Sequence, residues 1–224
     1  MKRSEINKIM NEALEFAEKY KFILPEFARW TPEDWKTKGH DYDEIRDNML
    51  GWDITDFGKG DYAKCGLLMF TIRNGNFSNP IYKKQYAEKL LISNVNQVTP
   101  YHFHWNKMED IINRGGGTLV IKCYNSDKNE NMMDTPVMVY IDGYNYEIGA
   151  GEELKLKAGQ SITLPVRQYH SFWAEGDCVL IGEVSSVNDD NVDNRFFEKV
   201  GRFPKIEEDE PALYFLSNEY PSAM

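Results

Sequence analysis

The chain has little cysteine. Cys65, Cys123 and Cys178 are its only three, they lie far apart, and none belongs to a CxxC pair. A disulfide framework or a thiolate zinc site is therefore not expected. A reducing cytoplasm is the simplest location for a chain with these cysteines, and we expect the protein there.

The chain also lacks long apolar runs and an excess of positive charge. No stretch reaches the length of a transmembrane helix, and Met1–Lys21 has mixed charges in place of the apolar core of a signal peptide. Asp and Glu outnumber Lys and Arg by 36 to 26, which gives a net charge of −10. A nucleic-acid partner and an anionic membrane surface both require a basic face, so we expect neither.

The N-terminal part of the chain carries helical signals. Ser4–Tyr20 repeats apolar residues at helical spacing, with Ser4 as its candidate N-cap. Thr31-Pro32 predicts a second helix start, and Asp43–Leu50 is a candidate for a short helical run. We expect residues 1–51 to form a helical N-terminal extension that packs on the rest of the chain.

From Trp52 onward, short apolar runs rich in β-formers alternate with turn residues. Asp142-Gly143 is a strong hairpin signal, whereas Gly115–Gly117 lacks a phosphate-binding context and predicts a tight turn. This rhythm favours an antiparallel sandwich or barrel over an alternating βαβ fold. We expect residues 52–224 to hold this β structure and a C-terminal tail, in one structural domain with the extension. The acidic cluster Glu207–Glu210 in the tail is expected to be a solvated face.

Three of the four histidines fall into one interrupted pattern. His102 and His104 are two residues apart, Glu109 follows, and His170 lies far downstream. Because residues i and i+2 of a strand share a face, the first two imidazoles project together. Histidine is the commonest metal ligand, so these four side chains are a candidate metal site. The fourth histidine, His40, is expected to be solvated or hydrogen bonded.

The composition of this set indicates an open site. Three neutral imidazoles and one carboxylate leave a divalent ion with about one uncompensated positive charge. An octahedral Mn²⁺ or Fe²⁺ ion would keep two positions free, which suits chelation of a carbonyl and the neighbouring hydroxyl. A structural metal would more often be enclosed by four cysteine or histidine ligands.

The spacing also resembles a known family pattern. His102 to Gly116, with the order HxHx4Ex6G, resembles the first cupin motif without its opening glycine. Gly159 to His170, with the order Gx5Px4H, resembles the second. The resemblance implies a mainly β fold, the double-stranded β-helix or jelly-roll barrel, with the metal held at its mouth by the three histidines and the glutamate.

A more specific resemblance covers nearly the whole chain. The strings Gln97–Gly117, Glu183–Asp190 and Asp193–Phe196 are similar to the cupin-type D-lyxose isomerases of enteric bacteria. That family has a helical N-terminal extension and interconverts D-lyxose with D-xylulose and D-mannose with D-fructose. It implies Mn²⁺ as the preferred cofactor among divalent metals, a small sugar as the partner molecule, and a homodimer.

Two residues are candidates for moving the proton during such a reaction. Glu183 lies on the strand predicted after that of His170, where a buried carboxylate could act as the base. Lys107 lies between two of the ligands, where it could donate to a sugar oxygen. The alternatives are an outward-facing Glu183 and a solvated Lys107. A cis-enediol route needs such a base, a hydride shift does not, and the sequence does not choose between them.

Five further residues are candidates for substrate binding. Strand parity places Gln168 and Phe172 on the face of His170. Asp190 and Arg195 could recognise hydroxyl groups from the tail, although charged tail residues are usually exposed. Lys89, at the start of an apolar strand, is a weaker candidate.

Two other functions share the same ligand set. An Fe-dependent cupin dioxygenase would need O₂, and a non-catalytic metal-dependent sugar-binding or sensor module would bind sugar without making product. The acidic charge and the missing DNA-binding helix pair weigh against a transcriptional regulator.

Overall fold

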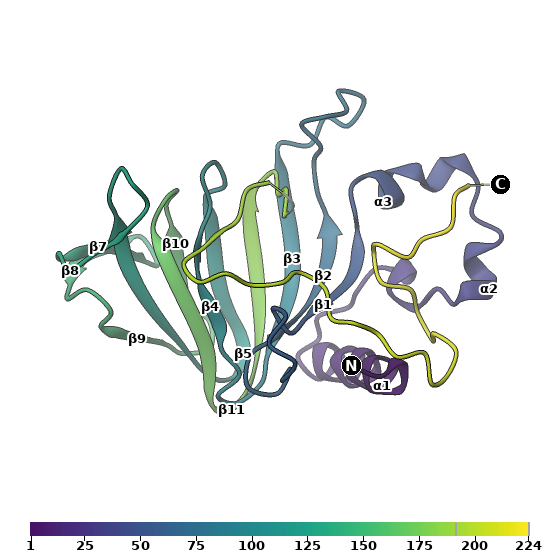
Figure 1. The fold of residues 1–224 in the computed structure, drawn as a ribbon, viewed down its shortest axis with the longest axis horizontal. Helices are drawn as coiled ribbons and strands as arrows, with labels where there is room; N and C mark the ends of the chain where they lie inside the picture. Colours follow the sequence, from purple (N-terminus) through teal and green to yellow (C-terminus); the bar gives the residue numbers. More distant parts are fainter. Residues whose placement is uncertain (191, 224) are drawn as a thin grey trace.

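The helices come first along the chain and gather at one end of the molecule. The computed structural model describes residues 1–190 and 192–223. Figure 1 shows the helices beside β1, with both ends of the chain on that side of the molecule. Among the described residues, no helix has the length and apolar character needed to cross a bilayer. The helices are α1 (Arg3–Lys19), η1 (Glu26–Arg29), α2 (Pro32–Trp35), η2 (His40–Tyr42) and α3 (Asp43–Asp47).

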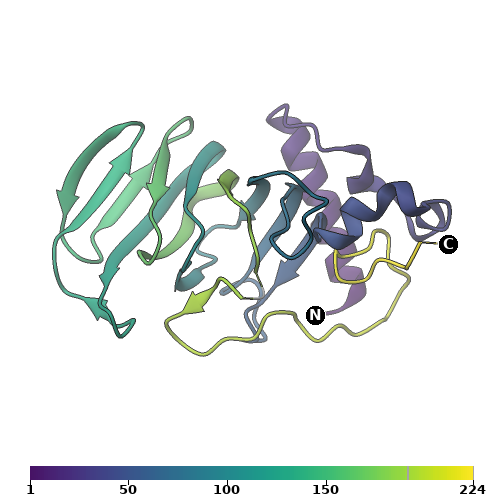
Figure 2. The same cartoon turned by 90° about the horizontal axis from the view of Figure 1, so that it is seen from above.

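The strands form an antiparallel network that fills the rest of the molecule. Its main path runs in the order β1-β2-β3-β11-β5-β10-β7-β8, and β4, β6, β9 and β12 pair beside this path. In Figure 2 the teal and green strands lie away from the purple helices. The strands are β1 (Gly51–Thr55), β2 (Leu67–Arg73), β3 (Tyr86–Ser93), β4 (Thr99–Phe103), β5 (Glu109–Ser126), β6 (Met132–Met133), β7 (Val137–Ile141), β8 (Tyr144–Ile148), β9 (Glu153–Leu156), β10 (Ser161–Leu164), β11 (Tyr169–Ser186) and β12 (Arg195–Phe196).

Two strands of 18 residues, β5 and β11, pair with each other along most of their length. The first part of β5 also pairs with β10, and its later part pairs with β9. The pairing register shifts between Leu180 and Ile181, next to Gly115 and Gly116, whose φ angles are 153° and 99°. A side chain at Gly116 would overlap the carbonyl oxygen of Cys178. The predicted tight turn is therefore wrong: the glycines allow a bend inside a continuous strand.

Strand β1 and nearly all of β2 are buried on both faces of the sheet. Leu67 and Met69 of β2 belong to the inner core, whereas Leu68 and Phe70 pack in a second core with α1. The periodic apolar face of α1 covers the outer side of the sheet, which explains why β2 is a continuous apolar run. The predicted N-terminal helix is thus present, and it leaves the inner face free to form a site.

The acidic tail cluster is exposed, as predicted, and it also binds the start of α1. Arg3 Nη2 lies 2.7 Å from Glu208 Oε1, and the Ser4 backbone N–H donates to Asp209 Oδ1 at 3.0 Å. Helix α1 begins at Arg3 with Lys2 as its N-cap, so Ser4 is not the cap. Carboxylates near a helix N-terminus are favourable because they complement its dipole.

Other local predictions are confirmed. Thr31 caps α2, because its side chain accepts a hydrogen bond from the Asp34 backbone N–H. Asp142-Gly143 joins β7 to β8 with both residues at positive φ. All three cysteines are free thiols.

Candidate metal centre

The fold brings together the four candidate ligands. His102 lies on β4, His104 follows that strand, Glu109 begins β5, and His170 is near the start of β11. His102 and His170 are direct partners in the β4–β11 pairing. One ligand atom from each of the four residues lies within 4.8 Å of the others, and all four residues are buried.

The three imidazoles are oriented by backbone carbonyls. Each Nδ1–H donates to a carbonyl oxygen, which leaves Nε2 as the nitrogen with a free lone pair. The Nε2 atoms of His104 and His170 are buried and have no hydrogen-bond partner. Such orphaned nitrogens fit a metal ligand. The acceptors are the carbonyls of Pro100 for His102 (2.8 Å), Asp193 for His104 (2.8 Å) and Gln168 for His170 (3.1 Å).

The carboxylate of Glu109 lies beside the Nε2 atoms of His104 and His170. Its Oε1 lies 3.3 Å from Nε2 of His104 and 3.1 Å from Nε2 of His170. Burial alone would raise the pKa of Glu109, but the Lys107 ammonium and the imidazoles hold this pKa well below its usual range. Burial, together with the two neighbouring imidazoles, lowers the pKa of His102 well below its usual value. An ionised carboxylate and neutral imidazoles are the donor set that a divalent cation requires.

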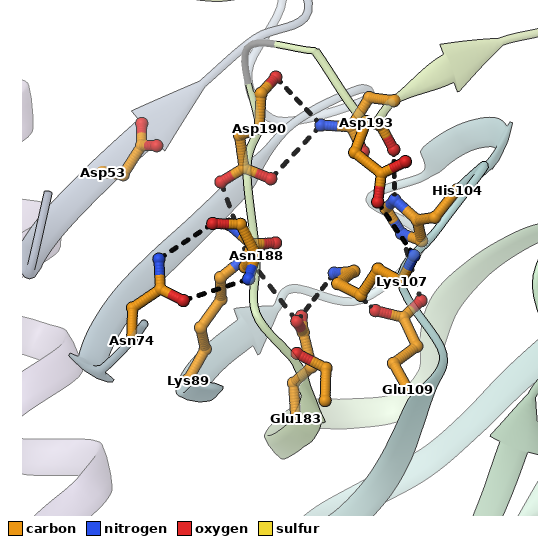
Figure 3. A network of polar contacts seen from close by, with 12 residues as sticks. Asp53, Asn74, Lys89, His104, Lys107, Glu109, Glu183, Asn188, Asp190 and Asp193 are labelled. Carbon is orange, nitrogen blue, oxygen red and sulfur yellow. Dashed lines mark hydrogen bonds and ion pairs between the residues drawn. The ribbon is translucent and has the colours of Figure 1, made fainter. Parts of the chain in front are cut away.

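A chain of alternating charges starts at Glu109 and crosses the inner face of the sheet. Lys107 Nζ lies 2.7 Å from Glu109 Oε2 and 2.8 Å from Glu183 Oε1. Lys89 Nζ lies 3.6 Å from the same Glu183 oxygen, and the two residues are paired between β3 and β11. Figure 3 shows Lys107 between the two glutamates and Lys89 beside Glu183. The three side chains of Lys89, Lys107 and Glu183 are at most 5% exposed, so these ion pairs are shielded from water.

The chain of charges continues away from the ligands. Lys89 Nζ lies 3.4 Å from Asp190 Oδ2, and Arg202 Nη2 lies 3.5 Å from the same oxygen. Arg202 also pairs with Asp53 of β1. Burial would raise the pKa of Asp190, but Lys89 and Arg202 outweigh burial and lower it. For Asp53 burial dominates, and its pKa is raised.

Except for His170 and Asp53, these groups line one cavity of about 50 Å³. Part of the lining is polar and holds most of the ligands and of the charged chain. The rest of the lining is apolar, and such low-dielectric surroundings strengthen the electrostatic interactions inside. The apolar residues are Phe57, Leu67, Met69, Leu91, Ile111, Phe172 and Phe196.

Most of the predicted site residues lie in this cavity. Glu183, Lys107, Lys89, Phe172 and Asp190 line it together with His102, His104 and Glu109, while His170 completes the ligand cluster.

Two predicted substrate-binding residues lie outside the cavity lining. Gln168 lies one residue before β11, and its Nε2 donates to the carbonyl of Met138 at 3.2 Å. Arg195 donates to Glu130 Oε2 at 2.7 Å instead. His40 is exposed and lies 2.8 Å from Asp43, as expected for a surface histidine.

Sequence reasoning missed several residues of the site. Asn194, Phe196 and Arg202 line the cavity, and Asp193 binds the loop that carries Lys107. All four follow β11, in a stretch without helical or strand periodicity. The signals for them were the family resemblance of the string Asp193–Phe196, which assigns no role, and the mixture of aromatic and charged residues in the tail. Their position depends on the pairing of β12 with β4, which places Phe196 against the His102 ring at 5.2 Å.

Comparison with known proteins agrees with this geometry. A family model described as D-lyxose isomerase matches residues 1–220. A D-lyxose/D-mannose isomerase of Escherichia coli O157:H7 is 48% identical over 98% of both chains. A second D-lyxose/D-mannose isomerase, from Serratia proteamaculans, is 46% identical over the same share.

Solved structures with little sequence similarity share the fold. The L-ribose isomerase of Cellulomonas parahominis covers 92% of this chain and 98% of its own, with a TM-score of 0.61 and 14% identity. The L-ribose isomerase of Acinetobacter sp. DL28, in a mutant form with L-ribose, has a TM-score of 0.55, 13% identity and the same coverage of both chains. At this identity the likeness concerns the fold alone.

Proposed function

The chain belongs to the D-lyxose isomerase family, and from this membership we propose that it interconverts D-lyxose with D-xylulose and D-mannose with D-fructose. It is a sugar isomerase of the aldose–ketose type. The observation that carries the proposal is the convergence of a metal donor set, a buried carboxylate and two ammonium groups in one cavity.

The donor set suits a divalent metal, and we propose Mn²⁺, because imidazole and carboxylate ligands without thiolates fit it. His102, His104, Glu109 and His170 would hold the ion. When bound, it would supply a Lewis acid for the oxygens on C1 and C2 of an open-chain sugar.

We assign Glu183 as the base that carries the proton between C1 and C2. A single ammonium group, that of Lys107, separates its carboxylate from the ligand Glu109, because Lys107 Nζ contacts both. Asp190, the third carboxylate in the cavity lining, lies further from the ligands along the chain of charges, because Lys89 stands between it and Glu183. A base has to lie within hydrogen-bond reach of the proton that it removes, which favours Glu183.

The remaining cavity residues orient the sugar. The Lys107 ammonium can donate a hydrogen bond to O2, and Lys89 with Asp190 can bind hydroxyl groups further along the sugar chain. Phe172 contributes to the apolar wall. Gln168 and Arg195 lie outside the lining, and we give them no contact with the sugar.

Two structural features go with this function. We propose that β5 and β11 are the long shared strands of a cupin double-stranded β-helix barrel, because each pairs along its two halves with different strands. We also propose a reducing cytoplasm as the location, on the strength of the three free cysteines.

A homodimer is proposed from a group of exposed apolar side chains. Tyr86, Met108 and Val184 are 50%, 49% and 43% exposed. They lie close together, because Tyr86 is paired with Ser186, whose N–H donates to the carbonyl of Met108. Sedimentation equilibrium tests this surface: Val184→Asp should give monomers if it forms the interface.

The reaction itself is tested with sugars. Mn²⁺-loaded protein is incubated with D-lyxose, D-mannose and D-ribose in turn, with and without O₂, and the ketose formed is measured. We expect D-xylulose from D-lyxose and D-fructose from D-mannose at rates independent of O₂. Turnover that stops without O₂ would support the dioxygenase alternative. Sugar binding with no product from any of the three would support the non-catalytic alternative.

A further inference from the structure

Asp193 binds the loop that carries Lys107 with three hydrogen bonds. It is 5% exposed and lies between β11 and β12. Its Oδ1 accepts from the Asn106 backbone N–H at 2.9 Å and from Asn106 Nδ2 at 3.1 Å. Its Oδ2 accepts from the Lys107 backbone N–H at 2.9 Å. A carboxylate is suited to this position because it accepts at both oxygens and donates at neither.

The same residue also orients a metal ligand. The backbone carbonyl of Asp193 accepts the Nδ1–H of His104 at 2.8 Å, and Figure 3 shows the two residues side by side. His102 and His170 are held differently, because their acceptors lie only two residues earlier in the chain. Among the three imidazoles of the cluster, only that of His104 is oriented by a segment distant in the sequence.

Through these contacts Asp193 connects the segment after β11 with the loop of Lys107 and with the ring of His104. The side chain of Asp193 fixes the loop between His104 and Glu109, which includes Lys107. Its main chain fixes the His104 ring. If the carboxylate lost its hydrogen bonds to the loop, the backbone carbonyl of Asp193 would move relative to the His104 ring. The Nε2 of His104 and the Lys107 ammonium would then both be displaced.

We propose that Asp193 is a positioning residue for the metal centre and for Lys107. Its carboxylate sets the geometry of His104 toward the metal and that of Lys107 toward Glu183. The effect on metal binding does not require the proposed reaction, whereas the effect on turnover rests on it.

The test uses Asp193→Asn and a matched control. The amide has the shape of the carboxylate but turns an N–H donor toward an N–H of Asn106 or Lys107, so at least one bond is lost. The control is Asp127→Asn. The Asp127 carboxylate also accepts from two backbone N–H groups and one asparagine amide, those of Asn129 and Asn131, in a loop outside the cavity lining.

Affinity for Mn²⁺ alone is measured by calorimetry, and melting of the metal-free proteins is measured beside it. We expect Asp193→Asn to bind Mn²⁺ about 10–100-fold more weakly, in the range typical of lost partners of metal ligands. Asp127→Asn should bind it as the unaltered protein does. A purely structural role predicts the reverse: a lower melting temperature of metal-free Asp193→Asn with unchanged Mn²⁺ affinity. That result would overturn the proposal.

A second variant covers the case in which Asp193→Asn does not fold. Asn106→Ala removes only the 3.1 Å bond to Oδ1 and keeps both backbone bonds. It should weaken Mn²⁺ binding by a factor of about two to ten, below the loss expected for a whole partner. Unchanged affinity in Asn106→Ala would then count against the proposal.

With saturating Mn²⁺, kcat for D-lyxose should also fall in Asp193→Asn. If neither the variants nor the unaltered protein makes ketose, the proposed function is wrong. In that case the Mn²⁺ affinities still test the role of Asp193.

Discussion

The inner face of the sheet differs between its two ends, although the same strands run through both. One end is an apolar core, and the other carries the ligands and the alternating charges. The inner face changes from apolar to polar within two residues on each of three neighbouring strands. The pairs are Met69 and Thr71 on β2, Leu91 and Lys89 on β3, and Ile181 and Glu183 on β11.

The two ends contribute differently: the apolar end contributes most of the stability, and the charged end performs the function. Burial of apolar side chains is the main favourable contribution to folding. A buried ion pair contributes little net stability, because desolvation offsets its attraction. The charged end is therefore best explained by the chemistry that it can perform, held in place by the apolar end.

The largest effect is expected from Glu183→Gln, at the charged end. It should lower kcat for D-lyxose by about 10²–10⁴-fold, the usual contribution of a general base. Mn²⁺ affinity should stay close to that of the unaltered protein, because Glu183 is outside the ligand cluster. Full turnover by Glu183→Gln would remove it from the mechanism and favour a hydride shift.

The neighbouring inward residue should show the opposite behaviour. Ile181 is fully buried in the inner core, so Ile181→Ala should lower the free energy of unfolding by about 2–5 kcal/mol. Its kcat at a temperature where it is folded should change far less than that of Glu183→Gln. Urea unfolding measures the first effect, with Glu175→Ala, at an exposed position of the same strand, as the control. An equal loss of kcat in both variants would contradict the separation.

The smallest effect concerns acid stability. The pKa of Asp190 is lowered, since Lys89 and Arg202 outweigh its burial. A carboxyl group with a lowered folded-state pKa stabilises the protein above its unfolded-state pKa, and this contribution is lost as the pH falls. The difference in unfolding free energy between the unaltered protein and Asp190→Asn should therefore shrink below about pH 5. A difference that stays constant or grows toward low pH would show that Asp190 is not held by these cations.

The ligand positions could be predicted because they depend on local rules. The HxH spacing predicted two side chains on one face. The sequence left the direction of Glu183 open, and only its pairing with Lys89 brings it to the inner face. The apolar runs predicted most of the strands, and the apolar spacing predicted α1. Each of these rules needs only residues that are close in the sequence.

The rest depended on contacts that no local pattern encodes. Arg202 and Asp193 reach the site because the chain after β11 pairs with β4 and passes the ligands. The acidic tail cluster binds α1 across the whole length of the chain. Gln168 lies one residue before β11, and its side chain donates to the Met138 carbonyl, a partner that strand parity does not predict.

The central claim is that one metal ion, held by the four buried ligands, is required for isomerisation beside Glu183. It is tested most directly by titrating chelator-treated protein with Mn²⁺ while measuring D-xylulose formed from D-lyxose. We predict that turnover rises until one ion is bound per chain, and that His170→Ala recovers no turnover over the same range. Turnover that persists in the chelator-treated protein, or full recovery in His170→Ala, would contradict the claim.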